Sequence, residues 1–125
     1  MSTIAVVEDN PDNRLLLHAL LDDAYDIVEF ENGVDALAGL RAGRPDLVLL
    51  DISLPGMDGN EILAHIRGDS ALRSLPVIAL TAHAMIGDRE KYLAAGFDDY
   101  VTKPIVDEAI LIGAIERGLG RRAGM

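Results

Sequence analysis

The sequence has 125 residues, half of them hydrophobic, with no cysteine and a formal net charge of −10 at pH 7. This length predicts one domain, and so large a hydrophobic fraction allows a core without metals or crosslinks. The lack of cysteine excludes disulfides and thiolate nucleophiles, and the acidity disfavours a nucleic-acid partner because phosphate binding draws on lysine and arginine.

Short apolar runs alternate along the chain with stretches whose apolar residues recur at helical spacing. The first run follows no basic segment and is too short for a signal peptide or a membrane span, so we expect a cytoplasmic protein with no membrane partner. In chain order the candidates are the strand Ile4–Val7, the helix Pro11–Asp22, the strand Asp26–Phe30, the helix Val34–Ala42, the strand Leu47–Leu50, the helix Gly59–Arg67, the strand Val77–Leu80, the helix Met85–Ala95, the strand Tyr100–Val101 and the helix Asp107–Gly118.

This fivefold strand–helix alternation is typical of an α/β fold with a parallel sheet covered by helices on both faces. Pro11 predicts a helix start and Asp58 a helix cap, while Gly118 predicts the end of the last helix. We expect one domain over residues 1–120, a short tail over residues 121–125 and no effector domain. The pair Asp98 and Asp99 is interpreted as solvated turn charges.

Asp51 ends the unbroken apolar run Leu47–Leu50 and precedes a Pro-Gly turn. Such a run predicts a strand buried on both faces, and ligands gather where parallel strands end at their carboxyl edge. The other strands end at the same edge, so we expect their terminal polar side chains to converge on Asp51. These residues are Glu8, Asp9, Thr81 and Lys103. Three neighbouring carboxylates repel one another unless a cation offsets them, and oxygen ligands without cysteine favour Mg²⁺.

Four motifs, in order and at compatible spacing, resemble the receiver domain of two-component response regulators over almost the whole chain. They are Val7-Glu8-Asp9-Asn10, Asp46 to Gly59 around Asp51, Ala79-Leu80-Thr81-Ala82 and Tyr100-Val101-Thr102-Lys103-Pro104. The segment from Thr81 to Ile105 is most similar to stand-alone receivers of the DivK type and to receivers of hybrid histidine kinases. The resemblance implies a flavodoxin-like, CheY-like doubly wound sheet with strand order 2-1-3-4-5.

The resemblance also implies a role for each matching residue. Asp51 is the expected phosphoacceptor. Mg²⁺ (or Mn²⁺) is expected on Asp51, on Asp9 directly, on Glu8 partly through water and on the backbone carbonyl of Ser53. Lys103 is expected to pair with the phosphoryl group, as phosphoryl transfer needs charge stabilisation more than an acid or base.

A switch is implied by the same resemblance. Thr81 follows the phosphoryl group inward, the small Ala82 leaves room for it, and Tyr100 turns inward as Thr81 moves. The bond before Pro104 is expected to be cis, which turns Lys103 toward the pocket and costs little before a proline.

The resemblance predicts a single-domain response regulator, phosphorylated by a histidine kinase or a histidine phosphotransfer protein and read by an unknown downstream protein. It is expected to be a phosphoacceptor that catalyses its own phosphorylation and dephosphorylation, not an enzyme in the usual sense, and a monomer or a weak phosphorylation-dependent dimer. Two alternatives stay open: a phosphorelay intermediate, and a receiver-like binding module not regulated by phosphorylation. An aspartyl-phosphate phosphatase is disfavoured because Ser53 stands where those enzymes carry a second aspartate.

The three histidines, His18, His65 and His83, are too scattered for a zinc site. His18 and His65 are interpreted as surface residues of their helices. His83, two residues after Thr81, is a weaker candidate for controlling water access to the acyl phosphate.

Overall fold

The computed structural model describes residues 2–54, 56–82, 88–103 and 108–123. Strands and helices alternate as the sequence predicts, and each expected element is present in the described residues. The expected helix starts at Met85 and Asp107 lie outside those residues. In chain order they are β1 (Thr3–Val7), α1 (Pro11–Leu21), β2 (Asp26–Phe30), α2 (Gly33–Ala42), β3 (Leu47–Asp51), α3 (Gly59–Gly68), β4 (Val77–Thr81), α4 (Asp88–Ala95), β5 (Asp99–Thr102) and α5 (Glu108–Ala123).

The strands form one five-stranded sheet in the order β2-β1-β3-β4-β5, and every neighbouring pair is parallel. The predicted fold class and strand order are therefore confirmed. β1, β3 and β4 occupy the centre, and the alternation of their apolar side chains fills a core on each face.

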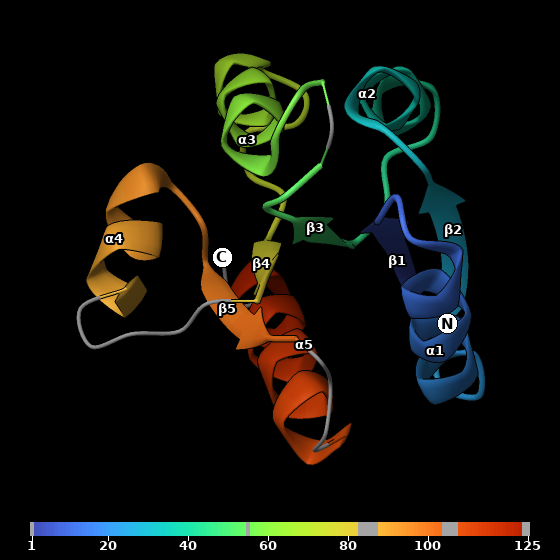
Figure 1. The fold of residues 1–125 in the computed structure, drawn as a ribbon. Helices are drawn as coiled ribbons and strands as arrows, with labels where there is room; N and C mark the ends of the chain where they lie inside the picture. The colour runs from blue at the N-terminus through green and yellow to red at the C-terminus, as the bar shows by residue number, and fades with distance from the viewer. Residues whose placement is uncertain (1, 55, 83–87, 104–107, 124–125) are drawn as a thin grey trace.

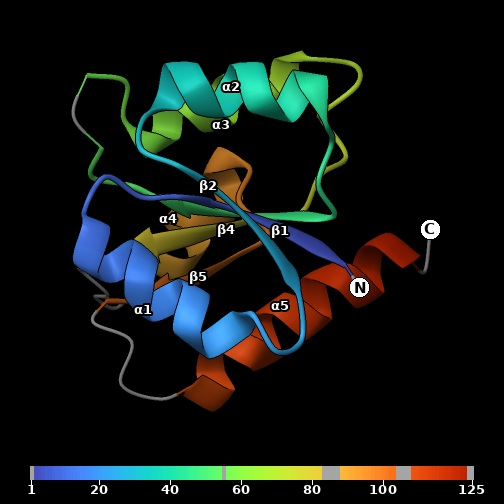
Figure 2. The ribbon, with the colours of Figure 1, turned by 90° about the vertical axis from the view of Figure 1, so that its right-hand side faces the viewer.

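The helices cover the two faces of the sheet. α2 and α3 pack on one face in a cluster that includes Val48 and Leu50 of β3 and Tyr92 of α4. α1 and α5 pack on the other face, against a cluster that includes Leu47 and Leu49. Figure 1 shows the sheet between these layers, and Figure 2 shows α2 and α3 above it with α1 and α5 below. No helix in the described ranges has the length and hydropathy to cross a bilayer.

Side-chain caps define the starts of α1 and α3. Asn10 Oδ1 accepts from the backbone N of Asp12 at 2.8 Å, and Pro11 occupies the first turn of α1. Asp58 Oδ1 accepts from Glu61 N at 3.0 Å, which confirms the predicted cap of α3. Both caps satisfy backbone N–H groups that the helix itself leaves without a partner.

The predicted end of α5 at Gly118 is wrong. The helix continues to Ala123 and thus includes part of the expected tail. Gly118 is buried, and a Cβ atom there would lie 2.7 Å from Leu47 Cδ1. The glycine therefore permits close contact between α5 and β3, and the helix passes through it.

The interpretation of Asp98 and Asp99 as solvated charges is also wrong. Asp98 Oδ2 accepts from Val77 N at 2.8 Å and from Arg67 Nη2 at 3.0 Å. Asp99 Oδ2 accepts from Arg117 Nη2 at 3.0 Å, and the Asp99 side chain is 14% exposed. Both carboxylates link the start of β5 to neighbouring elements.

Candidate phosphoacceptor site

Asp51 lies at the carboxyl end of β3, beside the ends of β1 and β4. Among the residues the structure describes, the buried polar side chains are Glu8, Asp51 and Thr81, at 1%, 2% and 3% exposure. All three come from strand ends at one edge of the sheet. Burial of polar groups is unfavourable without partners, so their concentration at one edge points to a functional site.

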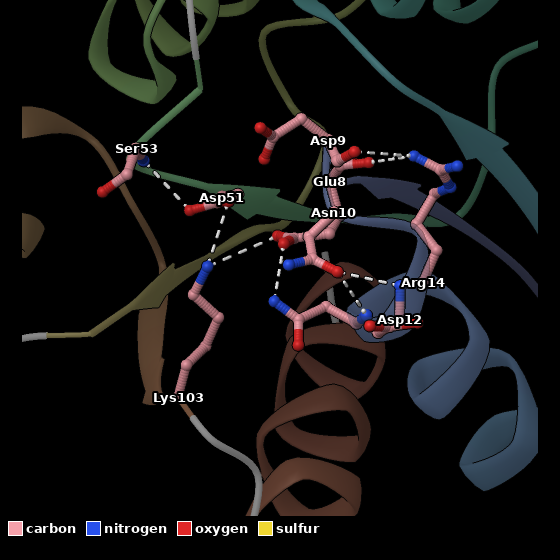
Figure 3. A network of polar contacts seen from close by, with 9 residues as sticks. Glu8, Asp9, Asn10, Asp12, Arg14, Asp51, Ser53 and Lys103 are labelled. Atoms are coloured by element: carbon pink, nitrogen blue, oxygen red, sulfur yellow. Dashed lines mark hydrogen bonds and ion pairs between the residues drawn. The ribbon is translucent and has the colours of Figure 1, made fainter.

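Lys103 joins the two buried carboxylates. Its Nζ lies 3.0 Å from Asp51 Oδ2 and 3.5 Å from Glu8 Oε2, and the lysine side chain is 18% exposed (Figure 3). Its backbone N donates to Thr81 O at 2.7 Å, which holds the segment after β5 against the end of β4. The ammonium group therefore offsets part of the carboxylate charge at the point where an incoming anion would bind.

The carboxyl of Glu8 holds a proton more firmly than an exposed glutamate. Burial, followed by a hydrogen bond to Asp51, raises the pKa of Glu8 from 4.5 to about 7. A hydrogen bond from Asn13 and the charge of Lys103 act in the opposite direction but do not cancel the increase. Without a cation, Glu8 thus keeps its proton in mildly acidic solution and releases it as the pH approaches neutrality.

Glu8, Asp9 and Asp51 can each offer one carboxylate oxygen, and these three oxygens lie within 4.8 Å of one another. Asp9 is exposed, whereas its two neighbours are buried, so the cluster is open on one side. Carboxylate oxygens with room for water are the donor set that Mg²⁺ prefers. These residues therefore fit the divalent cation expected from the sequence.

Two residues on α1 position the acidic pair, and neither was predicted from the sequence as a site residue. Arg14 Nη1 donates to the backbone oxygens of Glu8 at 2.8 Å and Asp9 at 3.3 Å. Asn13 Nδ2 donates to Glu8 Oε1 at 2.9 Å. Figure 3 shows Arg14 reaching from α1 toward Glu8 and Asp9. The place of Asn13 and Arg14 just after the cap Asn10 is the signal that could have identified them.

The loop after β3 also contacts the phosphoacceptor candidate. Ser53 N donates to Asp51 Oδ1 at 2.9 Å (Figure 3). Gly59, the first residue of α3, is packed against this loop: a Cβ there would lie 2.6 Å from the backbone oxygen of Asp51. The helix start is therefore in direct contact with the strand end that carries the carboxylate.

Thr81 and Tyr100 meet through a third residue. Tyr92 Oη on α4 donates to Thr81 Oγ1 at 3.0 Å, within the buried region, and the Tyr92 ring centroid lies 5.5 Å from that of Tyr100. Tyr92 was not predicted from the sequence as a site residue. Ala82, beside Thr81, is exposed.

Pro104 and His83 lie outside the described residues, so the cis bond and the water-access role remain sequence predictions. His18 and His65 are exposed on their helices, as expected. His18 lies 3.5 Å from Glu29 Oε1 and 3.8 Å from Asp22 Oδ2.

A family described as "Response regulator receiver domain" matches residues 4–116 of the chain. The polar-differentiation response regulator DivK of Brucella anthropi is 41% identical over 104 residues, covering 82% of this chain and 85% of DivK. The sensor protein GacS of Pseudomonas syringae is 42% identical over 111 residues, covering 86% of this chain. The chain spans only 12% of the length of GacS.

Solved structures show the same fold. The receiver domain of the sensor histidine kinase PA1611 from Pseudomonas aeruginosa has a TM-score of 0.85 and 38% identity, covering 95% of this chain and 98% of that domain. That domain holds a magnesium ion in its active-site cleft. A receiver domain of a histidine kinase from Syntrophus aciditrophicus has a TM-score of 0.86 and 33% identity, covering 97% of this chain and 92% of that one.

Proposed function

Because the chain belongs to the response regulator receiver domain family, we propose that Asp51 accepts a phosphoryl group from a phosphohistidine of a histidine kinase or a histidine phosphotransfer protein. The observation that carries this proposal is the meeting of three carboxylates and one lysine at the buried end of β3. Lys103 Nζ is 3.0 Å from Asp51, and the three carboxylate oxygens lie within 4.8 Å of one another.

In the proposed reaction, one Asp51 carboxylate oxygen attacks phosphorus while the phosphorus–nitrogen bond to the donor histidine breaks. The electron pair of that bond stays with the imidazole, and an acyl phosphate forms. Lys103 then pairs with a phosphoryl oxygen, and this new contact replaces part of its contact with Asp51. Glu8, Asp9, Asp51 and the backbone carbonyl of Ser53 would hold the Mg²⁺ (or Mn²⁺) ion. When bound, the ion neutralises charge on the phosphoryl oxygens.

The same proposal assigns the switch. The acyl phosphate brings acceptor oxygens within reach of the Thr81 hydroxyl, which moves toward them, and Ala82 leaves space for this movement. Tyr100 follows, and the surface of α4, β5 and α5 changes. The output is then contact with a downstream protein. Residues 1–120 form the proposed receiver domain.

A role as a phosphorelay intermediate is the second candidate. The 42% identity to a region of the GacS sensor supports it, because GacS is a sensor protein rather than a stand-alone regulator. A binding module independent of phosphorylation is disfavoured, since Glu8, Asp9, Asp51 and Lys103 are all present and in mutual proximity.

Phosphorylation by a small donor tests the assignment. Incubation with acetyl phosphate and Mg²⁺ should add one phosphoryl group to the wild type, as measured by intact-mass spectrometry. Asp51→Asn should abolish the adduct because the amide is a poor nucleophile. Asp23→Asn, which removes an exposed carboxylate after α1, is the matched control and should retain it. An unmodified wild type, or an equal adduct on Asp51→Asn, contradicts the proposal.

A further inference from the structure

The hydroxyl groups of Tyr92 and Thr81 form a buried hydrogen bond that links α4 to the end of β4. The donor–acceptor distance is 3.0 Å, and the two residues are 8% and 3% exposed. Thr81 is the residue whose hydroxyl has to reach the phosphoryl group. Tyr92 of α4 therefore already binds the Thr81 hydroxyl, on which the proposed switch depends.

The alternation of side chains along the strands places this bond away from Asp51. Val77 and Ala79 of β4 belong to the cluster on the α2–α3 face, and Thr81 continues their alternation. Leu47 and Leu49 of β3 belong to the opposite cluster, and Asp51 continues theirs.

The same alternation shows which face of the sheet the residues at the other two strand ends belong to. Glu8 continues the alternation of Ile4 and Val6, and Lys103 that of Val101; these apolar residues lie on the same face as Leu47. The alternation thus places Thr81 on the α4 face of the sheet. It places Asp51, Glu8 and Lys103 on the other face.

The Tyr92 ring also contacts the second member of the switch. Its centroid lies 5.5 Å from that of Tyr100, with the ring planes 41° apart, and 6.0 Å from that of Phe97 in an edge-to-face contact at 86°. Tyr100 packs against the same core cluster. One side chain of α4 therefore touches both Thr81 and Tyr100.

We propose that Tyr92 is a positioning residue that holds Thr81 on the α4 side of the sheet in the unphosphorylated protein. Thr81 breaks the bond to Tyr92 when it turns to the phosphoryl group. That loss releases the Tyr92 ring from its place between Thr81 and Tyr100 and so transmits the event to α4. This inference rests on the proposed function, because it requires a phosphoryl group on Asp51.

The affinity for beryllofluoride, a tetrahedral mimic of an aspartyl phosphate, tests this restraint. Tyr92→Phe removes only the hydroxyl and so destabilises the resting state relative to the bound state. The variant should bind beryllofluoride about 2- to 10-fold more tightly than the wild type, which is the effect of one net hydrogen bond. The measurement is a ¹⁹F NMR titration at constant Mg²⁺. Tyr25→Phe, which removes a hydroxyl from the turn between α1 and β2, is the matched control and should leave the affinity unchanged.

A double-mutant cycle separates this coupling from a general change in packing. In a Thr81→Val background the acceptor oxygen is absent, so adding Tyr92→Phe should leave beryllofluoride affinity unchanged. The chain has three tyrosines and no tryptophan, so tyrosine absorption is observable. Beryllofluoride should produce a tyrosine difference spectrum in the wild type, and its amplitude should fall in Tyr92→Phe.

The outcomes distinguish the two proposals. If the wild type binds no beryllofluoride, or Asp51→Asn binds it equally well, the proposed function fails. If the wild type binds it but Tyr92→Phe has unchanged or weaker affinity, the restraint by Tyr92 is wrong. An equal effect of Tyr92→Phe with and without the Thr81 hydroxyl also overturns it.

Discussion

At Glu8 the site and the stability of the fold conflict most clearly, because the site places a carboxyl where burial disfavours its charged form. Its carboxyl is 1% exposed and lies beside Asp51, with Asn13 and Lys103 as its favourable neighbours. Burial of a carboxyl next to another carboxyl favours a bound proton, and the pKa rises to about 7. The identity of Glu8 as a site residue could be predicted from its motif. Its protonation could not, because that depends on partners 43 and 95 residues away in the chain.

A pH dependence of stability follows from this pKa. Between pH 4.5 and about 7, the native protein holds the Glu8 proton and the unfolded chain does not. The free energy of unfolding of the cation-free protein should therefore fall as pH rises through this window, by up to about 1 kcal/mol per pH unit from Glu8. Urea unfolding at pH 5.5, 6.5 and 7.5 measures the slope.

Glu8→Gln is the control for that slope. The variant keeps the shape of the side chain but has no proton to release, so its stability should depend less on pH over the same window. The two proteins differ only at position 8, so effects common to both cancel in the difference. Parallel slopes for the two proteins would show that Glu8 carries no such linkage.

The start of α3 shows how an element supports the site. Gly59 follows the cap Asp58, and its backbone N donates to Ile52 O at 3.1 Å. A Cβ at this position would lie 2.6 Å from Asp51 O and 2.8 Å from Ile52 Cα, both of which are backbone atoms. The sequence pattern predicts the helix and its cap, but the close approach to β3 depends on how the helix docks on the sheet.

Gly59→Ala should therefore be destabilising, by about 1 to 3 kcal/mol, since backbone atoms have to move to admit the methyl group. The same displacement should slow phosphorylation at Asp51. Gly68→Ala, at the other end of the same helix, meets nothing within 4 Å and should change stability by less than about 1 kcal/mol, in the stabilising direction. Urea unfolding of both variants checks the contrast. Equal stabilities would contradict the close packing at Gly59.

Across the whole molecule, Arg67 connects segments that the strand–helix alternation does not relate. Its guanidinium donates to Gly96 O at 2.8 Å and to Leu75 O at 2.7 Å, and it pairs with Asp98 at 3.0 Å. The end of α3, the segment before β4 and the segment before β5 are thus held together. These bonds keep β4, which ends at Thr81, and β5, which is followed by Lys103, in position relative to α3.

Arg67→Lys should destabilise the protein by about 2 kcal/mol, because a lysine retains the charge but cannot supply the several fixed donors. Arg41→Lys is the matched control, because Arg41 is 52% exposed and pairs with Asp69 at 3.1 Å. Exposed pairs contribute little, so it should change stability by less than about 0.5 kcal/mol. Thermal unfolding compares the two, and a similar small effect of both substitutions would refute the role of Arg67.

The sequence by itself determined the elements, the fold class and the family. Apolar periodicity is a local pattern, and the order of the motifs is visible in the sequence alone. Asp51, Glu8 and Lys103 could therefore be assigned to one edge of a parallel sheet. Only the tertiary structure decided what those residues touch. Three features depend on the docking of one element against another. They are the Tyr92–Thr81 hydrogen bond, the hydrogen bond from Arg14 to the backbone oxygen of Glu8, and the continuation of α5 through Gly118. Docking is set by side-chain packing between residues distant in the chain, which a local pattern does not encode.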